Sequence, residues 1–229
     1  YFLAKHSPNS ILLCTTQFIN ATTKVILYER TDVRQVGYET LKLYLQILER
    51  TQTSHSQHPT FPLYIFAQQN LKKKYHEQHG AFLIFAALLE CSPSSVKDQA
   101  SDLMNFFLDF LPKSPPDIRC LILKSLVLLA PFELESFKTQ FFDIVLSALW
   151  SDTNQPKVNP IVSSSLLRLI QICPELFEQS EENLITTLRN LLVTCEDAPQ
   201  PSAFSIIKEI STHFPLIIQS NSRSITSIL

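Results

Sequence analysis

Two histidine pairs come nearest, in residue type and spacing, to a metal site in this sequence. His55 precedes His58 by three residues, and His76 precedes His79 by the same interval. Together the pairs could offer four imidazole ligands to zinc. The first pair lies in the polar stretch TQTSHSQHPT and the second follows a run of lysines, and neither has the spacing of a zinc finger. A metalloprotease helix needs two histidines about four residues apart, so we predict no metal site.

Groups that could support catalysis are also sparse. Only two glycines, Gly37 and Gly80, occur among 229 residues. Phosphate-binding loops, dinucleotide-binding turns and nucleophile elbows each need glycine where the backbone approaches a ligand. No Ser-His-Asp, Cys-His or paired-carboxylate combination stands out in the sequence. We therefore predict that the protein is not an enzyme and has no cofactor and no small-molecule substrate.

The charge and cysteine content indicate the environment of the protein. The formal net charge is −2 and the isoelectric point is near 6.3, which makes nucleic acid an unfavoured partner. The longest apolar run, Ala81–Leu89, is about half the ~20 residues that span a bilayer, so we expect no membrane partner. Five cysteines occur singly, as buried free thiols of an intracellular protein do. They are Cys14, Cys91, Cys120, Cys173 and Cys195.

Five apolar segments of similar length recur along the chain at nearly even intervals. They begin at Asp32, Glu77, Asp117, Pro160 and Pro201, which are 45, 40, 43 and 41 residues apart. Within each segment apolar residues recur every three or four positions, which predicts helices. We call these the return helices. They are expected at about 32–49, 77–90, 117–130, 160–173 and 201–214.

Further helices, the lead helices, are expected between them. Ser7-Pro8 and Ser92-Pro93 are N-cap signals for two of them, as Thr31-Asp32 is for the first return helix. The lead helices are expected at about 8–28, 61–74, 94–111, 133–150, 176–194 and 216–229. Phenylalanines at helical spacing are expected to pack the core, namely Phe106, Phe107, Phe110, Phe137, Phe141 and Phe142.

A period near 40 residues is typical of repeat arrays in which each helix pair packs only against its neighbours. The sequence therefore predicts an all-α fold, a right-handed α-solenoid of stacked antiparallel helix pairs with about 11 helices. We expect a single array over residues 1–229 that is a fragment of a longer solenoid. Its units are expected at about 8–50, 61–91, 94–131, 133–174 and 176–215, with a partial unit at 216–229.

Two segments, DVRQVGYETLKLYL and DIRCLILKSLVLL, resemble the second helix of HEAT and armadillo repeats. The motif Asp-(Val/Ile)-Arg begins both, at Asp32 and Asp117. The acidic residue suits the positive end of the helix dipole. The resemblance implies that the arginine pairs with an acidic group of the adjacent repeat. Glu77 keeps only the acid, and the units that begin at Pro160 and Pro201 have lost both features.

A second resemblance extends over two stretches of sequence, and neither contains a diagnostic motif. FPLYIFAQ and the stretch from Ala81 to Pro131 are similar to the vertebrate meiosis inhibitor protein 1 family, large armadillo-type proteins of meiotic recombination. This resemblance implies a nuclear scaffold that assembles the DNA-break machinery. It places the protein in the nucleus ahead of the cytoplasm.

Three basic residues occupy equivalent positions in the last three return helices. Lys124, Arg168 and Lys208 lie 7, 8 and 7 residues after the helix starts. If successive return helices stack side by side, these residues form a row that could bind an acidic peptide or helix of another protein. The alternative is that each helix carries a charged residue on its solvated side. A row of this kind could also serve a nucleic-acid-binding solenoid, a further alternative.

The function that the sequence predicts is a non-enzymatic scaffold for protein–protein interactions, built on helical repeats. The cationic run Lys72–Lys74 is typical of a solvated helix end. Trp150, at the end of a lead helix, is expected to pack beneath the neighbouring loop.

Overall fold

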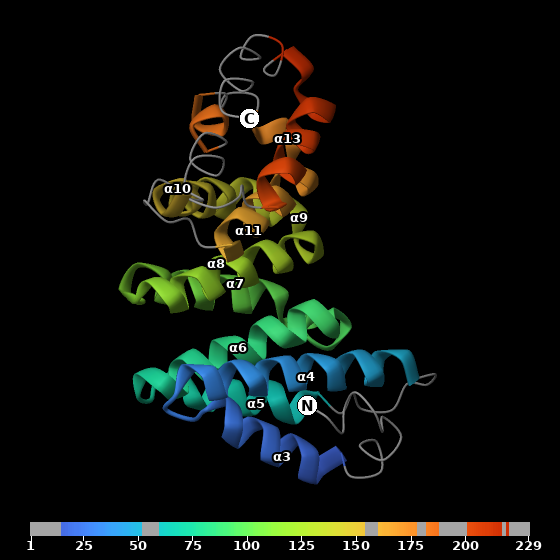
Figure 1. Cartoon of the computed structure of the whole chain (residues 1–229), viewed down its shortest axis with the longest axis vertical. Helices are drawn as coiled ribbons and strands as arrows, with labels where there is room; N and C mark the ends of the chain where they lie inside the picture. The colour runs from blue at the N-terminus through green and yellow to red at the C-terminus, as the bar shows by residue number, and fades with distance from the viewer. Residues whose placement is uncertain are drawn as a thin grey trace. The chain divides into compact units, whose positions relative to one another are not determined.

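The structure of the chain is a computed structural model, and it describes residues 15–51, 60–153, 160–177, 182–187, 201–216 and 219. These ranges contain about ten helices and no strand, which confirms the predicted all-α class for them (Figure 1). None of their helices is both long and apolar enough to cross a bilayer. The chain divides into two compact units, Tyr1–Leu129 and Ala130–Leu229.

The first unit contains three predicted return helices. They are α4 (Thr31–Thr51), α6 (Tyr75–Cys91) and α8 (Pro116–Leu129), each within two residues of its expected start and end. The helices that precede them are α3 (Thr15–Ile26), α5 (Phe61–Asn70) and α7 (Ala100–Phe110). Acidic side chains mark two of the starts: Glu77 accepts the N-cap amide of Lys74 at 3.2 Å, and Asp117 accepts the amide of Ile118 at 2.9 Å.

The helices of the first unit pack in a regular order. α4 packs against α6 and α6 against α8, and each of the three also packs against the helix that precedes it in the chain. α6 lies at the centre, and its residues from His79 to Leu89 are all buried. Their sequence is almost uniformly apolar, as a helix surrounded by others requires. The predicted stacking of successive return helices is therefore observed for α4, α6 and α8.

Both glycines of the chain lie against the C-terminal end of α3. A Cβ atom on Gly80 would lie 2.5 Å from the carbonyl oxygen of Ile26, and one on Gly37 would lie 2.8 Å from Ile26 Cγ1. Neither glycine has a positive φ. The glycines therefore allow a close approach of helices, since α3 could not otherwise reach both α4 and α6 at this distance.

The lead helices of the first unit are shorter than expected. The predicted helix at 94–111 begins only at Ala100, after two 3₁₀ turns at Pro93–Ser95 and Lys97–Gln99. The turns place the side chain of Val96 in the core, where it is fully buried. The predicted helix at 61–74 ends at Asn70, and the part of the helix at 8–28 that precedes residue 15 lies outside the described residues.

The second unit begins with a 3₁₀ turn (Ala130–Phe132), and one continuous helical stretch follows. It consists of α9 (Leu134–Ser136), a π-helical turn (Phe137–Phe141) and α10 (Phe142–Thr153), and it corresponds to the lead helix predicted at 133–150. The return helices predicted at 160–173 and 201–214 are α11 (Pro160–Ile172) and α13 (Pro201–His213). α11 packs against both α10 and α13.

Aromatic residues fill much of the core of each unit. Phe107, Phe137, Phe141 and Phe142 are buried as predicted, whereas Phe106 and Phe110 are only half-buried. Trp150 is half-buried and meets the edge of Phe177, in a 3₁₀ turn at Pro174–Phe177, with ring centroids 6.2 Å apart. Of the lead helices predicted at 176–194 and 216–229, residues 182–187 are helical and most others lie outside the described ranges.

Candidate functional site

Two polar clusters join α4, α6 and α8 within the first unit. One lies at the first turns of the three helices, and the other lies farther along them. The Arg34 cluster consists of Arg34, Tyr75, His79 and Asp117. The Glu90 cluster consists of Tyr38, Lys42, Glu90 and Lys124. Each cluster draws residues from all three return helices, so each is a contact between successive predicted repeats.

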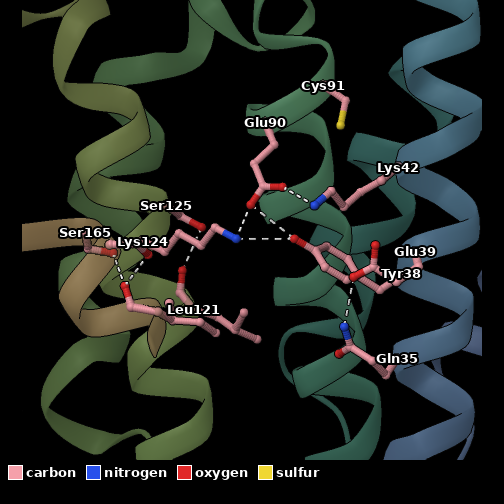
Figure 2. Close-up of polar contacts among 12 residues, drawn as sticks. Gln35, Tyr38, Glu39, Lys42, Glu90, Cys91, Leu121, Lys124, Ser125 and Ser165 are labelled. Atoms are coloured by element: carbon pink, nitrogen blue, oxygen red, sulfur yellow. Dashed lines mark hydrogen bonds and ion pairs between the residues drawn. The ribbon is translucent and has the colours of Figure 1, made fainter. Parts of the chain in front are cut away.

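Glu90 lies at the centre of its cluster, as Figure 2 shows. Its carboxylate accepts the hydroxyl of Tyr38 at 3.1 Å and pairs with Lys42 Nζ at 2.8 Å. It also pairs with Lys124, whose Nζ in turn donates to the hydroxyl oxygen of Tyr38 at 3.3 Å. The side chains of Glu90, Lys124 and Lys42 are only 17%, 21% and 25% exposed.

Glu90 stays ionised although its side chain is largely buried. Burial opposes ionisation of Glu90, but hydrogen bonds from Lys124 and Lys42 outweigh it and keep the pKa of Glu90 below its ordinary 4.5. Burial, together with the charge of Glu90, raises the pKa of Tyr38 above its ordinary 10. Tyr38 therefore stays protonated and donates. Its ring faces both ammonium groups, with Nζ of Lys42 and Lys124 at 5.2 and 5.9 Å from the ring centroid.

Arg34 is the arginine of the first Asp-Val-Arg motif, and it is 1% exposed. One terminal nitrogen donates to the carbonyl oxygens of Tyr28 and Glu29 at 2.9 and 2.7 Å, and the other donates to Thr31 Oγ1 at 3.0 Å. Its Nε donates to Nδ1 of His79 at 3.1 Å. The expected acidic partner of Arg34 is thus replaced by a histidine of the next return helix and by backbone carbonyls. Arg34 closes the turn between α3 and α4 and joins it to α6.

His79 connects Arg34 to the third helix. Its Nε2 lies 3.7 Å from Oδ2 of Asp117, and the hydroxyl of Tyr75 donates to the same carboxylate oxygen. Because Nδ1 accepts from Arg34, His79 carries no proton there, and the neutral ring holds its proton on Nε2, toward Asp117. Burial and the neighbouring Arg34 lower the pKa of His79 below 6.5, although Asp117 opposes them. Burial and Asp117 raise the pKa of Tyr75 to about 12.

An aspartate beside a histidine is also part of the hydrolase triad, where the second ring nitrogen takes a proton from a nucleophile. In the Arg34 cluster that nitrogen accepts an N–H from a buried guanidinium. His79 therefore has no nitrogen with which to activate a hydroxyl or a thiol. The contacts of this cluster hold helices together and do not prepare an acid–base reaction.

The predicted basic row is divided between the two units. Lys124 belongs to the Glu90 cluster of the first unit, and its charge is paired. Arg168 on α11 and Lys208 on α13 are exposed in the second unit, on helices that pack against each other. The binding role of the row stays a prediction. The side chains of Arg168 and Lys208 are exposed, whereas Lys124 pairs with Glu90.

The other residues that the sequence singled out have ordinary surroundings. Among the described residues no group of three or more histidine, cysteine or acidic side chains could hold a metal ion. His55 and His58 lie outside the described residues, and so do Cys14 and Cys195. The side chains of Cys91, Cys120 and Cys173 are buried as predicted, and burial raises the pKa of Cys173 to about 11. All three lysines of the run Lys72–Lys74 are exposed.

Sequence reasoning missed Glu90, although the sequence holds a signal for it. Glu90 is the only charged residue between Ala81 and Cys91, in a segment apolar enough to be buried on every side. A carboxylate in such a helix needs cationic partners, since an unpaired buried charge is costly. Lys42 and Lys124 lie in the two flanking return helices, so they were candidates for the cationic partners of Glu90.

Replacing Glu90 by glutamine is expected to lower the free energy of unfolding by about 2 kcal/mol at pH 7, the scale of hydrogen bonds to charged groups. Glutamine leaves two ammonium groups beside each other without an anion. Because the pKa of Glu90 is lowered in the folded protein, its contribution is present above about pH 4.5 and is lost as the pH falls through the folded pKa. Urea denaturation between pH 7 and pH 3 measures both effects.

Glu29→Gln is the matched control, because the side chain of Glu29 is exposed. It should change the free energy of unfolding by less than about 0.5 kcal/mol. If Glu90→Gln is as mild as this control, the Glu90 cluster contributes nothing to stability.

Comparison with known proteins yields no relative for this chain. No family model matches it, and neither a curated protein nor a solved structure is significantly similar to it. The contacts of α4, α6 and α8 and the exposed residues of α11 and α13 are therefore the basis for a functional proposal.

Proposed function

We propose that this chain is a non-enzymatic scaffold for protein–protein interactions, built as a right-handed α-solenoid of stacked antiparallel helix pairs. The observation that carries the proposal is the packing of α4 on α6 and of α6 on α8, each with its preceding helix beside it. In repeat arrays this order of contacts leaves an extended surface of successive return helices, which is where such proteins bind partners.

The polar groups of the first unit favour the same function. The buried or half-buried ionisable side chains of the Arg34 and Glu90 clusters are paired with one another across helices. Enzymes instead direct such groups into a cavity toward a substrate. Side chains that pair between helices stabilise a surface of defined shape, and a scaffold requires such a surface.

The partner that we propose is an acidic peptide or helix, and the residues proposed to contact it are Arg168 and Lys208 of the second unit. Both are exposed, and they lie on α11 and α13, which a hydrogen bond between Gln171 and Glu209 joins at 2.9 Å. Two cations on neighbouring helices can complement carboxylates spaced along a partner segment.

Reversing both charges, by Arg168→Glu with Lys208→Glu, is expected to reduce partner binding at least about tenfold, because each attraction becomes a repulsion. The full-length protein would be purified from cells with its bound proteins, and the affinity for each identified partner would be measured by calorimetry. Thermal unfolding should be unchanged, since both side chains are exposed.

A matched control carries the same change of charge elsewhere. Lys97 and Lys113 are exposed on 3₁₀ turns of the first unit, and the pair Lys97→Glu with Lys113→Glu should leave binding intact. Lys124 is kept unchanged, because a carboxylate there would face Glu90 and destabilise the fold. Binding that survives reversal of Arg168 and Lys208 would remove these residues from the proposal.

A narrower proposal, a nuclear scaffold for meiotic recombination, depends on sequence resemblance alone. The location of the tagged full-length protein in meiotic cells tests it. Binding of duplex DNA by the purified chain, in place of a protein, would favour the nucleic-acid-binding alternative.

A further inference from the structure

His79 lies in surroundings that disfavour a positive charge on its ring. Three charged or titratable side chains face its ring from the helices that meet there. Arg34 of α4 donates to Nδ1 at 3.1 Å, Asp117 of α8 lies 3.7 Å from Nε2, and Tyr75 of α6 has its ring centroid 6.2 Å away. His79 is 7% exposed, so water does not screen these contacts fully.

A proton on Nδ1 of His79 would turn the hydrogen bond from Arg34 into a contact between two donors. It would also place an imidazolium against a guanidinium, and both side chains are buried. Asp117 is the anion nearby, and its Oδ2 already accepts the hydroxyl of Tyr75. His79 therefore binds a proton more readily in a conformation in which its ring no longer contacts Arg34.

We propose that the Arg34–His79–Asp117 contact is a proton-sensitive joint, which releases the first turns of α4 and α6 from each other when His79 binds a proton. The Glu90 cluster keeps the same helices together farther along. Mild acid would thus loosen the stack at one end only, and the surface of the return helices would change shape without unfolding.

The pH range of the proposed release is set by the two clusters. The pKa of His79 is lowered in the folded state, so the neutral ring contributes its full stability above pH 6.5 and loses it as the pH falls toward the folded pKa. The pKa of Glu90 lies below 4.5, so Glu90 is still ionised at pH 5.5. Between pH 6.5 and pH 4.5 only His79 is expected to take up a proton in this contact. Local opening therefore increases by at most about tenfold per pH unit.

Hydrogen–deuterium exchange of the wild-type chain at pH 7.5 and pH 5.5, corrected for the intrinsic exchange rate, tests the proposal. We expect peptides covering residues 31–38 and 75–80 to open up to about tenfold more often for each pH unit below 6.5. Peptides covering residues 42–48 and 84–91 should keep their protection. Equal protection of the first turns at both pH values would overturn the proposal.

Two variants identify the titrating residue. His79→Asn keeps an acceptor for Arg34 but cannot be protonated, so the response to acid should disappear. His76→Asn removes a half-buried histidine from the same turn of α6 and should leave the response unchanged. An acid response that survives in His79→Asn, or vanishes in His76→Asn, would contradict the assignment. If His79→Asn does not fold, the wild-type and His76→Asn series decide.

Discussion

Arg34→Ala is expected to lower the free energy of unfolding by about 3 kcal/mol, the scale of lost hydrogen bonds from a charged donor together with the cavity left by a buried side chain. The guanidinium is 1% exposed and donates to His79, to Thr31 and to the carbonyl oxygens of Tyr28 and Glu29. Alanine leaves these acceptors without their donor and leaves a cavity between α4 and α6. Urea denaturation monitored by circular dichroism measures the loss.

Arg50→Ala is the control, because it makes the same change on the same helix at an exposed position. Its effect should stay within about 0.5 kcal/mol. Arg34→Lys keeps the charge but loses the planar set of donors, so it should recover only part of the stability. Equal unfolding free energies for Arg34→Ala and Arg50→Ala would show that the Arg34 cluster does not stabilise the fold.

Gly80→Ala is the second change with a large expected effect, about 3 kcal/mol, at the upper end of the range for overpacked cores. The added Cβ would lie 2.5 Å from the carbonyl oxygen of Ile26 and 2.7 Å from Leu27 Cδ2. A backbone atom cannot move aside alone, so the end of α3 must separate from α6. Thermal unfolding and hydrogen exchange of α3 measure the effect.

Gly37→Ala provides a graded comparison at the same contact. Its Cβ would meet Ile26 Cγ1 at 2.8 Å, a side-chain atom that a change of rotamer can move, and Ile26 N at 3.0 Å. Alanine also favours a helix over glycine by up to about 1 kcal/mol. The net loss should therefore be about 1 kcal/mol or less. If the two variants are equally stable, the backbone contact at Gly80 is not the reason for its glycine.

The helices of the return series could be predicted from sequence because their signals are local. An acid or a proline at the start and apolar residues at a helical period placed α4, α6, α8, α11 and α13 correctly. The start of α7 was wrong by several residues, because the burial of Val96 stabilises two 3₁₀ turns that no local signal distinguishes from a helix. Whether the whole chain forms a solenoid stays a prediction.

The contacts between helices were harder to predict. The arginine that follows an aspartate in a first turn was expected to form an ion pair with the next repeat. Arg34 instead donates hydrogen bonds to a histidine and to two carbonyl groups. Lys124 was grouped with Arg168 and Lys208 by its position in a helix, but the nearby carboxylate of Glu90 neutralises it. Such outcomes depend on distances between segments about 40 residues apart, and a single sequence does not contain those distances.

The burial of α6 from His79 to Leu89 has a consequence for how the chain folds. Helix pairs of a repeat array are often treated as separate units that gain stability one after another. α6 is covered by contributions from α3, α4, α5 and α8, so no single pair can bury it. The smallest cooperative folding unit should therefore include several helix pairs, with segments that flank α6 on both sides in the sequence.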